Sequence, residues 1–109
     1  MYYTYMLRCE DNSIYTGITT DLEKRMKEHF SKDKNCAKYT LRHSAKKLEA
    51  VWKSENRVLA SKLEYHIKRL TKIQKEEIIK NKKLNQEFLP KINVLDYTYF
   101  EDFKKKLDV

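Results

Sequence analysis

The sequence predicts a single α/β (α+β) domain in which a three-stranded antiparallel sheet is flanked by helices. Three observations lead to this fold class. Two runs of strand-forming residues, 2–9 and 14–18, are separated by a short polar turn, and a third such run occupies residues 48–53. Two helix-start patterns, at Thr20 and Thr71, precede segments whose apolar residues have a helical spacing. With 109 residues, the chain is long enough to bury a modest core.

The first two runs predict a β-hairpin around Gly17, the one glycine of the chain. A loop at residues 10–12 sets Leu7 opposite Tyr15 and Tyr5 opposite Gly17, with both tyrosines on one face. A slip of one residue would send the tyrosines to opposite faces. A glycine inside a strand usually marks a place where another group approaches the backbone too closely for a Cβ. The tyrosines have a second interpretation, as residues that simply favour strands.

A first helix is expected at residues 21–31, because Thr20 and Glu23 form a capping-box pattern. Its predicted apolar stripe is Leu22, Met26 and Phe30. Arg25 and His29 lie one turn apart at the edge of this stripe and face inward more than surface residues do. They are either a structural pair or part of a site that contacts phosphate.

A basic passage over residues 31–47 leaves room for a short helix, in which Tyr39 is either a stacking residue or a packing anchor. After the strand at 48–53, a second main helix is expected at 57–70. Glu64 falls at the border of its apolar stripe, where a carboxylate needs a partner or a metal.

Thr71 and Gln74 predict another capping box, with a helix to about residue 82. Asp96 is expected to cap a final short helix that carries Tyr97, Phe100, Phe103 and Leu107. No repeat or linker divides the chain, so we expect one domain over residues 1–83 and an extension, 84–109, that is either packed on the same domain or partly mobile.

The net charge of +8 is concentrated in two basic blocks, residues 22–47 and 68–83. Such blocks suit a phosphate backbone, although a solvated lysine-rich surface has the same composition. The chain contains no apolar run of membrane-spanning length and no signal-peptide pattern, which predicts a cytoplasmic protein without a membrane partner. Cys9 and Cys36 are too few and too isolated for a disulfide framework or a zinc site.

Several of these residues together resemble the GIY-YIG nuclease family. They are Tyr3-Thr4-Tyr5, Tyr15-Thr16-Gly17, Arg25, His29, Ala37-Lys38-Tyr39-Thr40 and Glu64, with Leu70-Thr71-Lys72 and Gln74-Lys75 beyond. The resemblance covers about residues 2–80 and is greatest to small YhbQ-like (UPF0213-type) members related to the endonuclease domain of UvrC. Tyr3-Thr4 replaces the Gly-Ile of the first name-giving triplet, and Thr16 replaces the isoleucine of the second.

The resemblance implies hydrolysis of phosphodiester bonds with one Mg²⁺, or Mn²⁺ in its place, held chiefly by Glu64. Tyr5 and Tyr15 correspond to the family's paired tyrosines, of which Tyr5 is expected to act on the attacking water. Arg25 corresponds to the arginine that stabilises charge on the phosphate, and His29 to a residue that contacts phosphate or tunes a tyrosine. Contacts to nucleic acid are expected from Lys24, Lys38, Tyr39, Arg42, Lys46, Lys68, Lys72 and Lys75.

We therefore expect an endonuclease that acts on nucleic acid, DNA above all, and prefers a structure to a sequence. Two other functions fit the same residues. One is a nucleic-acid-binding module that keeps the basic face without cleaving. The other is an adaptor that docks a protein through Tyr97, Phe100 and Phe103.

Overall fold

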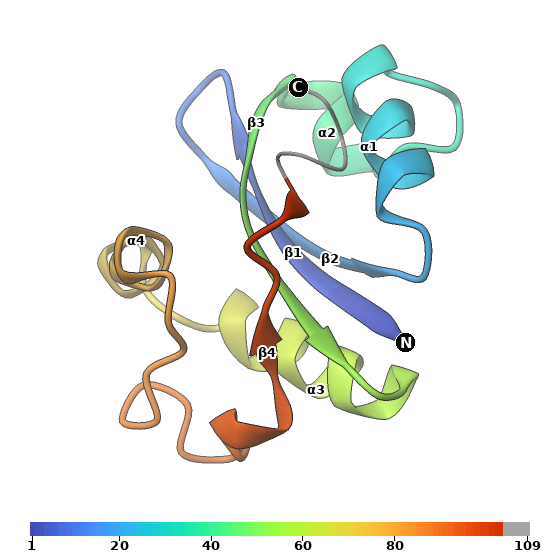
Figure 1. Ribbon diagram of the computed structural model, residues 1–109. Coiled ribbons are helices and arrows are strands. Elements are labelled where there is room, and N and C mark those ends of the chain that lie inside the picture. Colours follow the sequence, from blue (N-terminus) through green and yellow to red (C-terminus); the bar gives the residue numbers. More distant parts are fainter. Residues whose placement is uncertain (104–109) are drawn as a thin grey trace.

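The computed structural model describes residues 1–103. These residues form four strands and four α-helices, with one short 3₁₀ turn before the last strand, arranged as in Figure 1. The strands are β1 (Tyr2–Cys9), β2 (Ile14–Thr19), β3 (Ala45–Ser54) and β4 (Thr98–Tyr99), and the α-helices are α1 (Leu22–Ser31), α2 (Lys38–Arg42), α3 (Arg57–Lys68) and α4 (Lys72–Asn81). The 3₁₀ turn is η1 (Val94–Asp96).

The sheet has four antiparallel strands in the order β2-β1-β3-β4, so the prediction of three strands is wrong by one edge strand. The added strand pairs Thr98 with Lys53 and Tyr99 with Trp52. The amide of Phe100 continues the pairing by donating to the carbonyl of Val51 at 2.8 Å. Two residues are too few to show the alternation by which a strand is recognised in a sequence.

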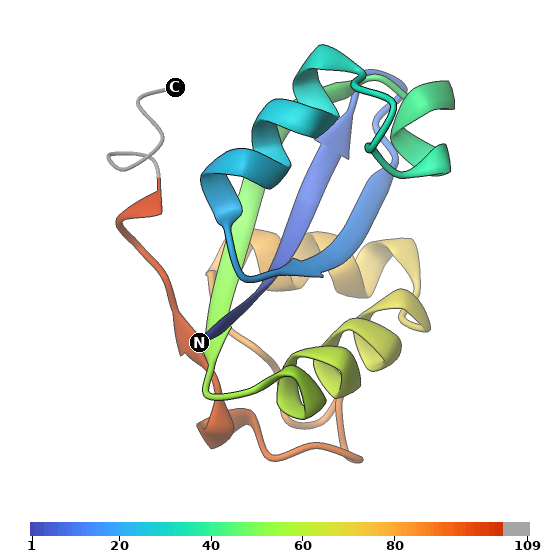
Figure 2. The ribbon, with the colours of Figure 1, turned by 90° about the vertical axis from the view of Figure 1, so that its right-hand side faces the viewer.

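Two apolar clusters cover the two faces of this sheet. Helices α1 and α2 lie on one side and α3 and α4 on the other (Figures 1 and 2). Tyr5 and Leu7 belong to the cluster under α1, whereas Met6 between them belongs to the cluster under α3. This is the alternation that a strand buried on both faces requires. Four residues of the extension, Leu84, Leu89, Ile92 and Tyr97, complete the cluster under α3.

The hairpin register is confirmed: Tyr5 pairs with Gly17, and Leu7 pairs with Tyr15. The pairing of β1 with β3 is less regular, because its register shifts between Met6 and Leu7. Leu48 and Val51 consequently lie in the same cluster although they are three residues apart. A β-bulge of this kind breaks the simple alternation along β3.

Helix α1 begins one residue later than its capping prediction. Asp21, not Thr20, is the N-cap, and its carboxylate accepts the amide of Lys24 at 3.1 Å. A carboxylate satisfies the free amides as well as a threonine does, and its charge also suits the positive end of the helix dipole. The predicted stripe is wrong at Phe30, which is 45% exposed, while His29 is fully buried in its place.

The capping box at Thr71 is confirmed, with Gln74 returning the hydrogen bond. The predicted helix after Asp96 is wrong over the next residues, because Tyr97 is extended and leads into β4. Phe103 then packs into the cluster under α1, whereas Tyr97 packs into the cluster under α3. Leu107, the last member of the predicted aromatic stripe, lies outside the described residues.

Cys9 and Cys36 are both buried free thiols, as their isolation in the sequence predicts. Within residues 1–103, no helix has both the length and the apolar character needed to cross a membrane.

Candidate active site

The two tyrosines of the hairpin lie side by side on the face covered by α1. Their ring centroids are 6.2 Å apart. A Cβ on Gly17 would lie 2.5 Å from the Tyr5 hydroxyl oxygen and 3.0 Å from Cε2 of Tyr15, which is closer than van der Waals contact allows. The space over Gly17 is therefore filled by the tyrosines themselves, and any other residue at this position would push them apart.

His29 connects this tyrosine pair to α1 and α2. Its Nε2 lies 2.7 Å from the Tyr5 hydroxyl, and its Nδ1 lies 2.8 Å from the Thr40 hydroxyl. Thr40 donates its own proton to the carbonyl of Ala37 at 3.1 Å, so its oxygen is free to accept from Nδ1–H. Nε2 is then the ring's acceptor, and the Tyr5 hydroxyl donates to it.

Burial fixes the charge state of both partners. Burial first, and the nearby Arg25 guanidinium second, lower the pKa of His29 from 6.5 to about 4, while Glu28 opposes the shift. Burial, followed by the charge of Tyr15, raises the pKa of Tyr5 well above 10, with Arg25 acting against the shift and Glu64 adding to it. At neutral pH the pair is therefore a neutral imidazole and a neutral phenol.

The two tyrosines differ in their exposure to solvent. Tyr5 is completely buried, and its hydroxyl is committed to His29. Tyr15 is only half-buried, so it is the phenol of the pair that solvent can reach. The sequence-based assignment of the attacking water to Tyr5 therefore has less support in this structure than an assignment to Tyr15.

Arg25 projects from α1 at the edge of the same cluster, with 22% of its side chain exposed. One nitrogen, Nη1, lies 2.9 Å from the Glu28 carboxylate and 2.7 Å from the carbonyl of Asn35. These contacts hold the guanidinium in one position. The guanidinium also lies close enough to the Tyr5 hydroxyl for a hydrogen bond that lowers the pKa of this phenol. A guanidinium has five N–H donors, so one held in this way still suits contact with a bound anion.

Helix α3 approaches the tyrosines from the edge of the sheet formed by β2. Glu64 is 24% exposed and pairs with Lys68, one turn later, at 3.4 Å. The Lys68 ammonium also lies 5.6 Å from the centroid of the Tyr15 ring. In the protein without a metal, Lys68 is thus the partner that the partly buried Glu64 carboxylate requires.

Glu64 is a carboxylate that could bind a metal without other protein ligands. No group of three or more His, Cys, Asp or Glu side chains gathers anywhere in residues 1–103. A single carboxylate, with water and a substrate phosphate completing the shell, is the donor set that suits hydrated Mg²⁺. The residues present therefore fit the predicted metal, with Glu64 as its one protein ligand.

The cationic residues expected to bind nucleic acid lie on both sides of Tyr15. Lys24, Lys38, Arg42 and Lys46 are exposed on α1, on α2 and at the start of β3. Lys68 ends α3, and Lys72 and Lys75 lie on the first turn of α4. Burial, followed by the positive charges of Lys72 and Lys68, lowers the pKa of Lys75, as is expected of three neighbouring lysines. Lys72 is partly engaged within the protein, because it contacts the carbonyl of Asn12 and pairs with Glu76 at 3.4 Å.

Two residues of this region were not recognised from the sequence as members of the site. Thr40, the hydroxyl that orients His29, belongs to the Ala37–Thr40 segment of the family resemblance, but no periodicity relates it to His29. Asn35 contributes through its backbone carbonyl, which no side-chain pattern can reveal.

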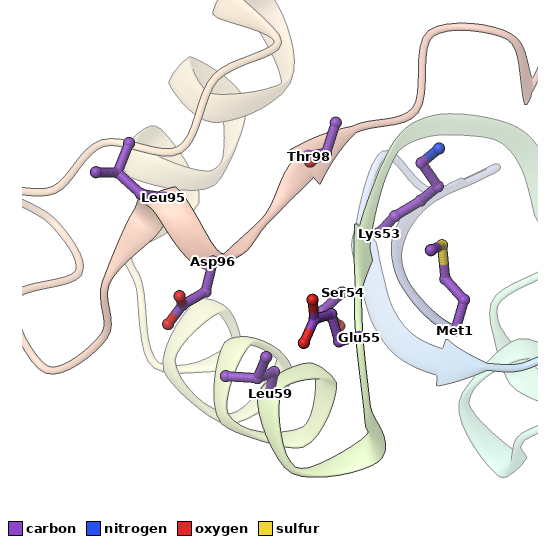
Figure 3. A pocket seen from close by; sticks show the side chains of 8 residues that line it. All are labelled: Met1, Lys53, Ser54, Glu55, Leu59, Leu95, Asp96 and Thr98. Carbon is purple, nitrogen blue, oxygen red and sulfur yellow. The ribbon is translucent and has the colours of Figure 1, made fainter.

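A pocket of about 410 Å³ lies elsewhere, between the end of β3, the first turn of α3 and the segment before β4 (Figure 3). It is lined by Met1, Lys53, Ser54, Glu55, Leu59, Leu95, Asp96 and Thr98. None of the five candidate catalytic residues contributes to this pocket, so it is separate from the candidate active site.

Comparison with known proteins yields a consistent set of relatives. Residues 1–85 match the family described as the GIY-YIG catalytic domain. UPF0213 protein FN1575 of Fusobacterium nucleatum is 50% identical over 78 residues, which cover 72% of this chain and 76% of that protein. UPF0213 protein CPE1444 of Clostridium perfringens is 43% identical over 88 residues, covering 80% of this chain and 91% of that one.

A solved structure is also similar. The solution structure of UPF0213 protein BH0048 from Bacillus halodurans is 36% identical to this chain, covers 85% of it and 98% of its own length, and has a TM-score of 0.49. The family match extends over most of the chain, and the curated relatives align over most of their own length. The chain therefore belongs to the GIY-YIG family and, within it, is similar to the UPF0213 proteins.

Proposed function

We propose that this protein is an Mg²⁺-dependent endonuclease that hydrolyses phosphodiester bonds in DNA and prefers a structure over a sequence. The observation that carries the proposal is the position of Tyr15. This half-exposed phenol has the Lys68 ammonium 5.6 Å from its ring centroid and the Tyr5 ring beside it. Arg25 and Glu64 both act on the pKa of Tyr5, which supports their belonging to one site with the tyrosines.

In the proposed reaction, the Tyr15 hydroxyl accepts a hydrogen bond from the attacking water and orients it towards the phosphate, and the proton that the water loses passes to solvent. The Lys68 ammonium, which lies 5.6 Å from the centroid of the Tyr15 ring, supplies positive charge beside this water. Tyr5 and His29 act as positioning residues, because their hydrogen bond fixes the ring against which Tyr15 packs.

Arg25 would stabilise the negative charge that develops on the phosphate, using the guanidinium donors that Glu28 and Asn35 leave free. Glu64 would hold Mg²⁺, which supplies charge neutralisation at the phosphate and a lowered pKa for bound water. Because Glu64 is paired with Lys68 in the protein alone, Lys68 would have to release it when the metal binds.

The proposal is tested by incubating the purified protein with blunt duplex, flapped, branched and single-stranded DNA and with RNA, in Mg²⁺ and in Mn²⁺. We expect cleavage of at least one structured DNA and its loss in Glu64→Gln. Glu55→Gln, which changes a carboxylate just before the same helix, is the matched control and should remain active. A fully active Glu64→Gln protein, or no cleavage of any substrate with either metal, would contradict the proposal.

A nucleic-acid-binding module without catalysis is the second candidate, and the Glu64–Lys68 pair favours it because a paired carboxylate needs no metal. Both candidates predict binding that weakens steeply with salt and varies little with sequence, since the basic residues would contact phosphates. An adaptor function has less support, because two of its three proposed docking residues, Tyr97 and Phe103, are 8% and 2% exposed, and the third, Phe100, is partly buried.

A further inference from the structure

A row of aromatic rings runs from the buried tyrosine pair to the surface of α2. Tyr15 lies 5.6 Å from Tyr39, and Tyr39 lies 4.3 Å from His43, all between ring centroids. The last pair is stacked, with only 24° between the ring planes. The row starts at Tyr5, which is buried, and ends at His43, whose side chain is 36% exposed.

Local structure fixes this stacked pair. Tyr39 and His43 are four residues apart on α2 and its C-cap, so their side chains lie one above the other on one face. The β1–β2 turn holds the outer ring from the side, because the Asp11 carboxylate contacts Nδ1 of His43. Asp11 is itself fixed by the hydroxyl of Ser13 at 2.6 Å and its amide at 3.1 Å. An aromatic surface that is already ordered loses little entropy when a ligand stacks on it.

Three cationic side chains lie close in the chain to the stacked pair, and one carboxylate, Asp11, contacts its outer ring. Lys38 and Arg42 are exposed on α2 beside it, and Lys46 is exposed at the start of β3. A partly exposed ring with cations around it is the combination by which proteins bind single-stranded nucleic acid, stacking on the bases and pairing with the phosphates. Packing alone would not require the outer ring to remain accessible.

We propose that the Tyr39–His43 pair is a platform on which an unpaired nucleobase stacks, beside the phosphate that is cleaved. The substrate class is then DNA with unpaired nucleotides at the cleavage point, such as flaps and single-stranded tails. This inference rests on the proposed function, because the platform adjoins Tyr15. In a duplex both faces of a base are covered by its neighbours, so a paired base must first be extruded at a cost in energy.

The test measures binding in the absence of a divalent metal, so that cleavage does not interfere. Fluorescence anisotropy with the full chain compares a short single strand with the same strand carrying abasic sites. Each stacked base contributes enough to strengthen binding by about 5- to 150-fold, and the abasic strand should bind more weakly by a factor in this range. His43→Ala should weaken binding of the base-bearing strand alone, and His43→Phe should restore it.

Arg42→Gln is the control from the same helix, because a lost phosphate contact should weaken both strands by the same factor and reduce the salt dependence. Equal affinity of the wild-type chain for both strands would overturn the inference. The inference would also fail if His43→Ala weakened the binding of both strands equally and lowered the melting temperature, since the pair would then be a packing anchor.

The outcomes for the platform and for the proposed nuclease can be told apart. A chain that binds in the expected way but cleaves nothing would refute the nuclease and leave the platform in place. Cleavage with equal binding of both strands would refute the platform alone, and no binding to either strand would refute both.

Discussion

Arg8 and Arg25 serve opposite faces of the same sheet, and they differ in how completely their donors are used. Arg8 forms two hydrogen bonds with the Glu76 carboxylate, at 2.5 and 2.6 Å, and a third with Glu49 at 3.0 Å. It also contacts Asn12 in the hairpin turn. Only 12% of its side chain is exposed.

Arg25, by contrast, binds Glu28 and the carbonyl of Asn35 through the same nitrogen, Nη1, and is 22% exposed. Its single carboxylate partner, Glu28, lies on its own helix. Two partly buried arginines of similar appearance in a sequence can therefore have different roles, one in stability and one in binding. Arg8 ties together β1, β3 and α4, whereas Arg25 is held in place with donors left for a phosphate.

The largest expected effect is on turnover. Arg25→Ala should slow cleavage by roughly a hundredfold or more, as is found when a preorganised charge stabiliser is removed. The free energy of unfolding should fall less than in Arg8→Ala, because Arg25 has one carboxylate partner and Arg8 has two. Single-turnover kinetics on a cleaved substrate and urea unfolding measure the two quantities. Lys27→Ala, at an exposed position on the same helix, is the control. Equal losses of activity in both variants would contradict a specific role of Arg25 in turnover.

Arg8→Ala should act on stability instead. It leaves Glu49 and Glu76 without their main partner, at 14% and 35% side-chain exposure. Removing one member of a buried pair costs about 3–5 kcal/mol, and partial exposure of Glu76 reduces this to roughly 2–3 kcal/mol. Urea unfolding should show this loss, while turnover per folded molecule is unchanged. Lys27→Ala, which breaks an exposed pair with Glu23, should cost less than about 0.5 kcal/mol. A similar cost for both variants would mean that the Arg8 cluster is no more than a surface feature.

His29 makes stability near the site depend on pH. Its pKa is lowered from 6.5 to about 4 in the folded protein, so between these values the unfolded chain binds more protons than the folded one. Stability should therefore fall as the pH is lowered from 6.5 towards 4, by roughly 2–3 kcal/mol. Urea unfolding curves measured across this pH range should show a smaller fall in stability for His29→Gln than for the wild-type chain. His66→Gln should show the same fall as the wild-type chain. An unchanged pH profile in His29→Gln would show that other groups cause the dependence.

The smallest effect concerns two threonines that occupy triplet positions where the family has isoleucine. The buried hydroxyl of Thr16 has no hydrogen-bond partner among residues 1–103, whereas that of Thr4 donates to the carbonyl of Ala60 at 3.3 Å. Thr16→Val should raise the free energy of unfolding by about 1 kcal/mol, and Thr4→Val should lower it by about 0.5–1 kcal/mol. Equilibrium unfolding of the two variants decides this. Destabilisation by both substitutions would indicate that the Thr16 hydroxyl has a partner after all.

The local parts of the fold could be predicted from the sequence. The loop length set the hairpin register, which in turn placed Tyr5 and Tyr15 on one face with Gly17 beside them. The capping box at Thr71 set the start of α4. In each case the interacting residues are close in sequence, so that turn geometry and capping chemistry decide the outcome with few alternatives.

Predictions failed where a choice depended on distant residues. Phe30 and His29 are neighbours on α1, and the more polar of the two is buried because Tyr5 and Thr40 satisfy both nitrogens of its ring. The aromatic residues after Asp96 form an edge strand because β3 offers unpaired backbone groups there. Neither partner is visible in the pattern of the segment itself.

The sequence by itself determined the family, the hairpin and its tyrosine pair, the main helices and the two basic blocks, because motif order, turn length and side-chain spacing are local properties. Only the tertiary structure decided the tautomer and charge of His29, the exposure of Tyr15 rather than Tyr5, the pairing of Glu64 with Lys68 and the different use of Arg8 and Arg25. These depend on burial and on hydrogen-bond partners from other elements. A side chain acquires such surroundings only when the helices pack on the sheet.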